Sequence, residues 1–233
     1  MKNRIKISVV LLLFTSSIIA QCTDINTKEI AKYLNEKVKP RLDIKLDKHD
    51  GFLAINGTRQ NLDLKDVKIS PVSREWTYFF ENVRRIDSNF WYDSKKNAFV
   101  LDVKFENNGI ELKGRCEGCL TKRMKDDRAP DINWANPQIM RFTLKPIVFQ
   151  RSVSFKVTQV EMLGKLVGSG FGSVFSRLTK GIEDVVGQEL TRVFTTDVTK
   201  RLFNDALRPL LKSKKTVSAN SVSLASSSLR VCK

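Results

Sequence analysis

The longest pattern in the chain is an amphipathic stripe in its C-terminal half. Apolar residues recur between positions 171 and 211 at steps of mostly three and four, the spacing of one face of an α-helix. They are Phe171, Val174, Phe175, Leu178, Ile182, Val185, Val186, Leu190, Val193, Phe194, Leu202, Phe203, Ala206, Leu207, Leu210 and Leu211. The stripe predicts a helix over residues 171–212, roughly 60 Å long, with a kink expected at Thr195-Thr196-Asp197. Such a stripe must be covered along its whole length.

Strand-like sequence precedes this stripe. Leu42, Ile44 and Leu46 alternate with polar residues, which predicts a half-buried strand. Residues 52–55 continue as strand up to Asn56-Gly57, a strong hairpin signal. Alternation over residues 99–105 and 110–113, separated by Asn107-Asn108-Gly109, predicts a second hairpin over residues 99–113. Further strands are expected to start near residues 140 and 153.

The remaining segments are less regular. Apolar spacing over residues 26–39 predicts a helix that Pro40 ends. Residues 71–85 fit either a short helix or an aromatic strand. Residues 121–137 are polar, carry two prolines and are expected to form a loop. Glycines between residues 164 and 172 are expected to loosen the chain before the long helix, and the Ser- and Lys-rich residues 213–233 to form a mobile tail.

The first twenty residues have the pattern of an export signal. Lys2, Arg4 and Lys6 precede an apolar run over residues 7–14, and small residues up to Ala20 mark a cleavage point. Cys22 leaves lipoprotein modification as an alternative, but Gln21 stands where a small residue is usual, which favours ordinary cleavage. We therefore expect a signal peptide over residues 1–20, one domain over residues 21–212, the tail over residues 213–233, and a secreted or periplasmic protein.

Composition supports a folded, basic domain. Hydrophobic residues make up 41% of the chain, and its formal net charge is +16, of which residues 1–20 contribute three, leaving +13. A basic exported protein favours anionic partners such as phospholipid head groups, fatty acids, lipopolysaccharide and anionic membrane surfaces. Nucleic acid is not expected as a partner, because the chain is expected to be exported and shows no nucleic-acid-binding motif.

Four cysteines follow the signal: Cys22, Cys116, Cys119 and Cys232. Export makes disulfides plausible. Cys116 and Cys119 form a CxxC that follows a strand-like run, which favours a local disulfide or a turn with two thiols over a redox motif. Cys22 and Cys232 are candidates to join the two ends of the chain, a pairing that sequence does not establish. The only histidine is His49, and no second CxxC exists, so no metal site is expected.

Enzyme signatures are missing from the sequence. It has no G-x-S-x-G, no glycine-rich phosphate loop and no metal-ligand cluster. Glu183 and Asp184 are adjacent on the expected helix and point in different directions, so we read them as surface residues rather than an acid/base pair. We expect no enzymatic activity and no cofactor.

The order of these segments resembles a known family. The run VKPRLDIKLDKHDGFLAINGTRQNLDLKDVKI follows the N-terminal helix, then come AFVLDVKFENNGIELKGRCEGC, VSFKVTQVEM and the long amphipathic segment. Over residues 25–212 this order resembles one barrel of the bactericidal/permeability-increasing protein and lipid-transfer family, within the tubular lipid-binding superfamily. The resemblance implies an α+β fold in which a highly curved antiparallel sheet wraps around a long C-terminal helix, with a short N-terminal helix. The family's disulfide from sheet to long helix has no counterpart here, because this segment contains no cysteine.

The resemblance also implies a lipid-binding or lipid-transfer protein with an apolar tunnel between sheet and helix. The expected lipid-binding residues are Phe99, Leu101, Val103, Phe155, Val157, Phe171, Phe175, Leu178, Ile182, Val186 and Leu190. Lys122, Arg123, Lys125 and Arg128 are the expected head-group docking residues. Each set has a plainer interpretation, a packed core for the first and a solvated loop for the second. The alternative function is therefore an exported basic binding or scaffold protein with a filled core and no lipid ligand.

Overall fold

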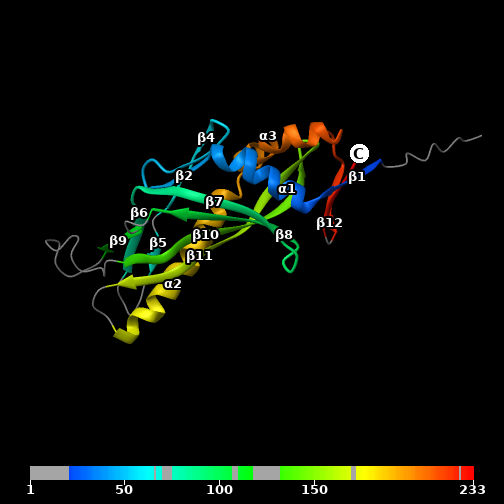
Figure 1. The fold of residues 1–233 in the computed structure, drawn as a ribbon. Helices are drawn as coiled ribbons and strands as arrows, with labels where there is room; N and C mark the ends of the chain where they lie inside the picture. The colour runs from blue at the N-terminus through cyan, green and yellow to red at the C-terminus, as the bar shows by residue number, and fades with distance from the viewer. Residues whose placement is uncertain are drawn as a thin grey trace, which may run out of the picture.

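A computed structural model describes residues 21–65, 67–69, 75–106, 110–117, 132–168, 172–225 and 227–233. The chain is built mainly from strands, with helical segments near the N-terminus and late in the chain (Figure 1). The helical segments are α1 (Thr27–Tyr33), η1 (Leu34–Val38), η2 (Lys39–Arg41), α2 (Gly172–Phe194) and α3 (Asp197–Ser213). The strands are β1 (Cys22–Asn26), β2 (Leu42–Leu46), β3 (Phe52–Ile55), β4 (Thr58–Asn61), β5 (Val67–Ile69), β6 (Glu75–Phe80), β7 (Val83–Asp93), β8 (Ala98–Phe105), β9 (Ile110–Glu117), β10 (Ile132–Phe149), β11 (Ser152–Gly168), β12 (Ser221–Ala225) and β13 (Ser228–Cys232).

The long strand β10 organises the main antiparallel sheet. One of its edges pairs with β11 along nearly its whole length. The other edge pairs with β9 through Ile132–Trp134 and with β8 through Ile139–Leu144. The sheet therefore divides beside β10 into two arms, one running β8-β7-β2-β3-β4 and the other β9-β6-β5.

Helices α2 and α3 connect β11 to the far ends of both arms. The carboxylate of Glu189 on α2 accepts a hydrogen bond of 2.8 Å from the backbone N–H of Lys65, just before β5. At the start of α3, Thr199 donates to the side chain of Gln60 on β4 at 3.0 Å. Both arms thus bend back toward the helices, and the apolar core fills the space between them. Aromatic rings such as Phe155 and Phe203, 5.9 Å apart, join sheet and helices.

The polar stretch between the two late helices explains where they separate. The hydroxyl of Thr196 accepts from the N–H of Thr199 and caps α3, while Thr195 donates to the carbonyl oxygen of Val157 on β11. Hydroxyl side chains that bond backbone groups in this way favour helix ends. The position of the expected kink is confirmed, but the segment is two helices.

The expected fold class is therefore wrong. Strand is the main secondary structure, the helical segment is divided between α2 and α3, and the chain continues after α3 into β12 and β13. Residues 213–233 do not form the expected mobile tail. Strands β12 and β13 form a hairpin there, and β13 pairs with β1 in a three-stranded sheet. Leu229 and Val231 of β13 are 2% and 1% exposed. Two buried side chains in one short strand secure a segment whose composition is otherwise polar.

Two further expectations about strands are corrected. Residues 99–113 do not form a hairpin, because β8 and β9 lie beside successive parts of β10 and do not pair with each other. Residues 132–137, expected in a loop, begin β10, and β11 continues to Gly168 through the expected glycine linker. The hairpin turn at Asn56-Gly57 is confirmed, since both residues have positive φ, 52° and 83°, as the favoured two-residue turn requires.

A buried carboxylate stabilises the turn after β2. Asp47 is 8% exposed and accepts hydrogen bonds from the backbone N–H groups of His49 and Asn82 at 2.9 and 2.8 Å. Burial by itself would raise the pKa of Asp47, but these N–H donors, that of Asp50 and the charge of Lys45 lower it from 3.8 to about 2. The ionised carboxylate therefore ties the β2–β3 turn to the start of β7.

Candidate functional site

The eight expected lipid-binding residues whose side chains are described come together, but they do so as a packed core. Phe99, Leu101 and Val103 on β8, Phe155 and Val157 on β11, and Ile182, Val186 and Leu190 on α2 are each between 0% and 3% exposed. A side chain bordering a tunnel wide enough for an acyl chain would keep part of its surface exposed on the tunnel side, because the tunnel is open space that a water molecule could also enter. The rings of Phe99 and Phe155, 5.1 Å apart, pack directly on each other.

For several expected site residues, the structure does not describe the residue or its side chain. Phe171, Cys119 and the docking residues Lys122, Arg123, Lys125 and Arg128 lie outside the described residues. Phe175 and Leu178 lie in α2 and Cys116 in β9, but their side chains are not described. The described part of the wall is thus the middle and C-terminal part of α2 with β8 and β11.

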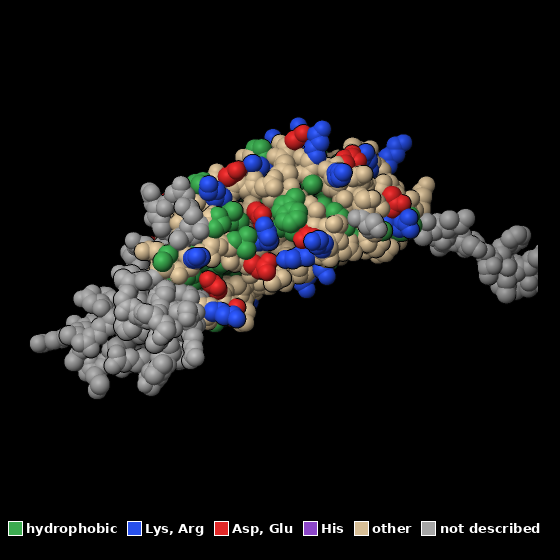
Figure 2. Space-filling view, turned by 60° about the horizontal axis from the view of Figure 1, so that its bottom comes forward, with side chains coloured by type: hydrophobic (Ala, Val, Ile, Leu, Met, Phe, Trp, Pro, Cys, Tyr) green, Lys and Arg blue, Asp and Glu red, His purple; other side chains and the backbone are tan. Residues whose placement is uncertain are grey.

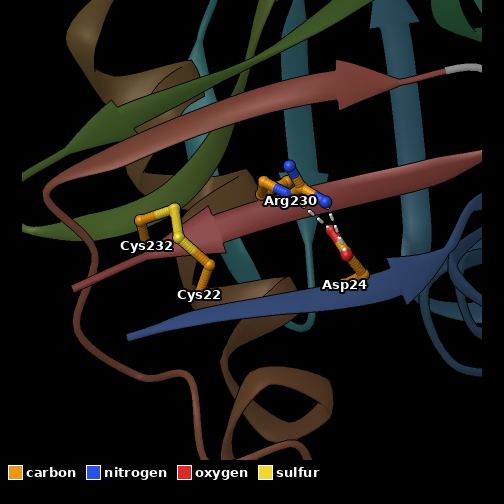
Figure 3. The surroundings of a disulfide bond; sticks show 4 residues. All are labelled: Cys22, Asp24, Arg230 and Cys232. Carbon is orange, nitrogen blue, oxygen red and sulfur yellow. Dashed lines mark hydrogen bonds and ion pairs between the residues drawn. A yellow bond between two sulfur atoms is a disulfide. The ribbon is translucent and has the colours of Figure 1, made fainter. Parts of the chain in front are cut away.

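The candidate disulfide between the chain ends is present. Cys22 on β1 and Cys232 on β13 are joined, and beside them the guanidinium of Arg230 donates two hydrogen bonds of 3.0 Å to the carboxylate of Asp24 (Figure 3). The side chains of Asp24 and Arg230 point toward each other across the paired strands β1 and β13. The disulfide and the ion pair hold the first and last described strands together.

A basic surface emerges where the first and last helical segments lie side by side (Figure 1). The hydroxyl of Tyr33 on α1 donates to the carbonyl oxygen of Ala206 on α3 at 3.1 Å, and Lys214 forms an ion pair with Glu29 at 2.7 Å. We call the exposed cations of residues 27–41 and 197–215 the basic helical face. They are Lys28, Lys32, Lys37, Arg41, Arg201, Arg208, Lys212 and Lys215.

The basic helical face holds much of the net charge. Residues 27–41 carry five Lys and Arg against two Glu, and residues 197–215 carry six against two Asp, which gives +3 and +4. Together they supply +7 of the +13 carried by residues 21–233. Arg201, Arg208 and Lys212 are exposed and form no ion pair with another described residue. Sequence reasoning missed this face, because each segment alone has the pattern of an ordinary solvated helix.

Elsewhere the described surface is more balanced. On the face of the molecule in Figure 2, Lys and Arg side chains alternate with Asp and Glu around a central group of hydrophobic side chains. Cross-strand ion pairs have the same character, such as that of Arg141 on β10 with Asp102 on β8 at 2.8 Å. The hydrogen bond from Arg141 to Asp102 is the main cause that raises the pKa of Arg141. Such pairs balance part of the charge of the sheet, while Lys145 of β10 and Lys156 of β11, which lie opposite each other, are exposed and form no ion pair with a described residue.

A hollow of about 600 Å³ lies between β11 and α2. It is lined by Thr158, Gln159, Val160, Glu161 and Met162 of β11 and by Glu183, Asp184, Gly187, Gln188 and Thr191 of α2. We call it the β11–α2 hollow. The hydroxyl of Thr191 accepts a hydrogen bond of 3.0 Å from the N–H of Val160, which attaches the helix to the edge strand at one end of the hollow.

The close approach of helix and strand beside this hollow requires a glycine. A Cβ on Gly187 would lie 2.8 Å from the carbonyl oxygen of Val160. Any larger residue there would therefore move α2 away from β11 and change the width of the hollow. The sequence offered no signal for this site, since Gly187 stands among ordinary helix residues.

Comparison with known proteins gave no match: no protein family, curated protein or solved structure matches this chain. Among the described residues, no group of three or more His, Cys, Asp or Glu side chains is placed to hold a metal ion. None of the described helices combines the length and the hydropathy needed to cross a bilayer.

Proposed function

We propose that this chain is an exported binding protein that docks on anionic membrane surfaces through its basic helical face. The observation that carries the proposal is the concentration of +7 of the +13 net charge in two helical segments that lie together. Each Lys or Arg near an anionic bilayer contributes about 1 kcal/mol of attraction. Three exposed cations without ion-pair partners among the described residues, Arg201, Arg208 and Lys212, are free to supply it.

Export is part of the proposal. Residues 1–20 have the pattern of a signal peptide. The bond between Cys22 and Cys232 supports the same compartment, because structural disulfides persist outside the reducing cytosol.

The packed core favours surface binding over an acyl-chain tunnel. The eight described wall residues retain at most 3% of their surface. Admitting an acyl chain at these positions would require the aromatic and aliphatic contacts between β8, β11 and α2 to separate. A surface-docking protein needs no such opening, because its ligand stays outside the core.

The test compares vesicles of phosphatidylcholine alone with vesicles that also contain phosphatidylglycerol. Co-sedimentation should show binding only to the anionic vesicles, and added salt should weaken it. The variant Arg201→Glu/Arg208→Glu/Lys212→Glu should bind at least about 100-fold more weakly, since it removes three attractive charges worth about 1 kcal/mol each and puts three repelling carboxylates in their place.

The control variant reverses three exposed lysines on the sheet, Lys145→Glu/Lys156→Glu/Lys165→Glu, and so changes the net charge equally. It should retain most of the binding. Equal loss in both variants would show that only net charge matters and would contradict docking through the helices. Saturable uptake of a fluorescent fatty acid by the unchanged protein, with no preference for anionic vesicles, would favour the tunnel instead.

A further inference from the structure

The β11–α2 hollow has the dimensions of a small-molecule site. Its volume of about 600 Å³ lies within the range typical of ligand pockets. Buried Val160 and Gly187 form its base, and exposed Thr158, Gln159 and Gln188 stand at its rim. It shares no residue with the basic helical face, so the two surfaces can be tested independently.

Charge decides which ligands suit this hollow. Its lining holds the carboxylates of Glu161, Glu183 and Asp184 and no Lys or Arg. Glu161 is paired with Lys96 at 3.2 Å, but Glu183 and Asp184 form no ion pair with a described residue. In a chain with a net charge of +13 beyond residue 20, the lining of this hollow is negative, and one negative charge remains when Lys96 beside Glu161 and Lys180 beside Glu183 are counted. Anionic ligands are therefore disfavoured here, and cations are favoured.

The state of Glu183 supports the same conclusion. Burial raises the pKa of this carboxyl, and the neighbouring charge of Asp184 raises it further, while Lys180 partly offsets both effects. A positive charge placed in the hollow would relieve this repulsion and favour the ionised carboxylate.

The spacing of the polar groups favours an extended organic cation over a metal ion. Within the described residues the carboxylates of the hollow do not converge into a group able to hold a metal. Amide and hydroxyl groups of Gln159, Gln188 and Thr158 can accept hydrogen bonds from ammonium groups. The side chains of Val160 and Met162 give methylene groups apolar surface to contact.

We propose that the β11–α2 hollow binds a linear aliphatic polyamine, with ammonium groups at the carboxylates of Glu183 and Asp184 and the methylene chain against Met162. Titration calorimetry with spermidine and with putrescine tests this directly on the purified protein. One saturable site is expected, with tighter binding of spermidine because it carries one more charge.

Isosteric variants locate the site. Glu183→Gln/Asp184→Asn keeps the shape of the hollow and removes two charges, so binding of spermidine should weaken roughly tenfold. The matched control, Asp43→Asn/Glu106→Gln, removes one Asp and one Glu that are exposed elsewhere, and should bind as the unchanged protein does. Circular dichroism and thermal unfolding confirm that each variant is folded.

A second variant obstructs the mouth of the hollow without changing its charge. Gln188→Trp replaces an exposed lining residue on α2 and should also weaken binding. The proposal is overturned if the unchanged protein shows no saturable heat with either amine, if the two charge-removing variants bind equally, or if Gln188→Trp has no effect. Saturable binding of citrate that Gln188→Trp abolishes would likewise contradict it.

Discussion

Two glycines of α2 provide a matched test of how this helix packs on β11. Gly181 and Gly187 both lie within Gly172–Phe194, six positions apart. A Cβ on Gly181 would meet no atom within 4 Å, whereas a Cβ on Gly187 would lie 2.8 Å from the carbonyl oxygen of Val160. Replacing either glycine by alanine gains about 1 kcal/mol of helix propensity. Only the second replacement forces a contact shorter than carbon and oxygen atoms allow.

The expected magnitudes have opposite signs. Gly181→Ala should raise the free energy of unfolding by about 1 kcal/mol. In Gly187→Ala the opposing atom belongs to the backbone of β11, whose Val160 pairs with Phe142 of β10, so it cannot move independently. The helix must shift instead, which strains the bond between Thr191 and Val160. Overpacking costs about 1–3 kcal/mol and a weakened hydrogen bond about 1 kcal/mol, so a net loss of about 1–3 kcal/mol is expected.

Urea unfolding followed by circular dichroism measures both changes. For a domain of this size, 1 kcal/mol corresponds to about 2–4 °C in Tm, so the two variants should separate clearly in thermal unfolding as well. If both alanines stabilise the protein to the same extent, α2 does not approach β11 at Gly187. The helix–strand contact and the hollow beside it would then be wrong.

Three other predictions concern stability. Reducing the Cys22–Cys232 bond, which closes a separation of 210 residues, should cost up to about 5 kcal/mol if chain entropy dominates; unfolding with and without dithiothreitol measures this loss, and an unchanged Tm would contradict it. Ile182→Trp, at a position that is 0% exposed, should lower stability by about 1–3 kcal/mol if the core is filled; an unchanged Tm would instead indicate unoccupied space. Asp47→Asn should cost about 2 kcal/mol at neutral pH, because the ionised carboxylate stabilises the fold above its unfolded pKa of about 3.8. This contribution is lost as the pH falls through about 2. The free energies of unfolding of the unchanged protein and of Asp47→Asn, measured in urea, should therefore become equal there, and a difference that persists would refute the reasoning.

Local features of the chain were readable from sequence alone. The alternation over residues 42–46 and the Asn56-Gly57 turn specify their strands and hairpin, because side-chain period and turn chemistry act within a few residues. The N-terminal helical segment begins at Thr27, next to its expected start, but Pro40 does not end it, because the segment continues as η1 and η2 to Arg41. The helix break falls at Thr195-Thr196, where hydroxyl side chains compete for backbone groups. In the part of α2 whose side chains are described, the apolar stripe also identified the buried side correctly, including Ile182 and Val186.

Long-range pairing and surface assembly depended on the tertiary structure. Periodicity shows which side of a segment is apolar, but it does not show which partner covers that side. The stripe of α2 was therefore equally compatible with a tunnel wall and with the packed core that the described residues form. Strand β13 was not predicted from the sequence for the same reason, since Leu229 and Val231 are buried only because the chain folds back onto β1. The basic helical face and the β11–α2 hollow each combine residues from separate segments, so neither exists until the fold brings those segments together.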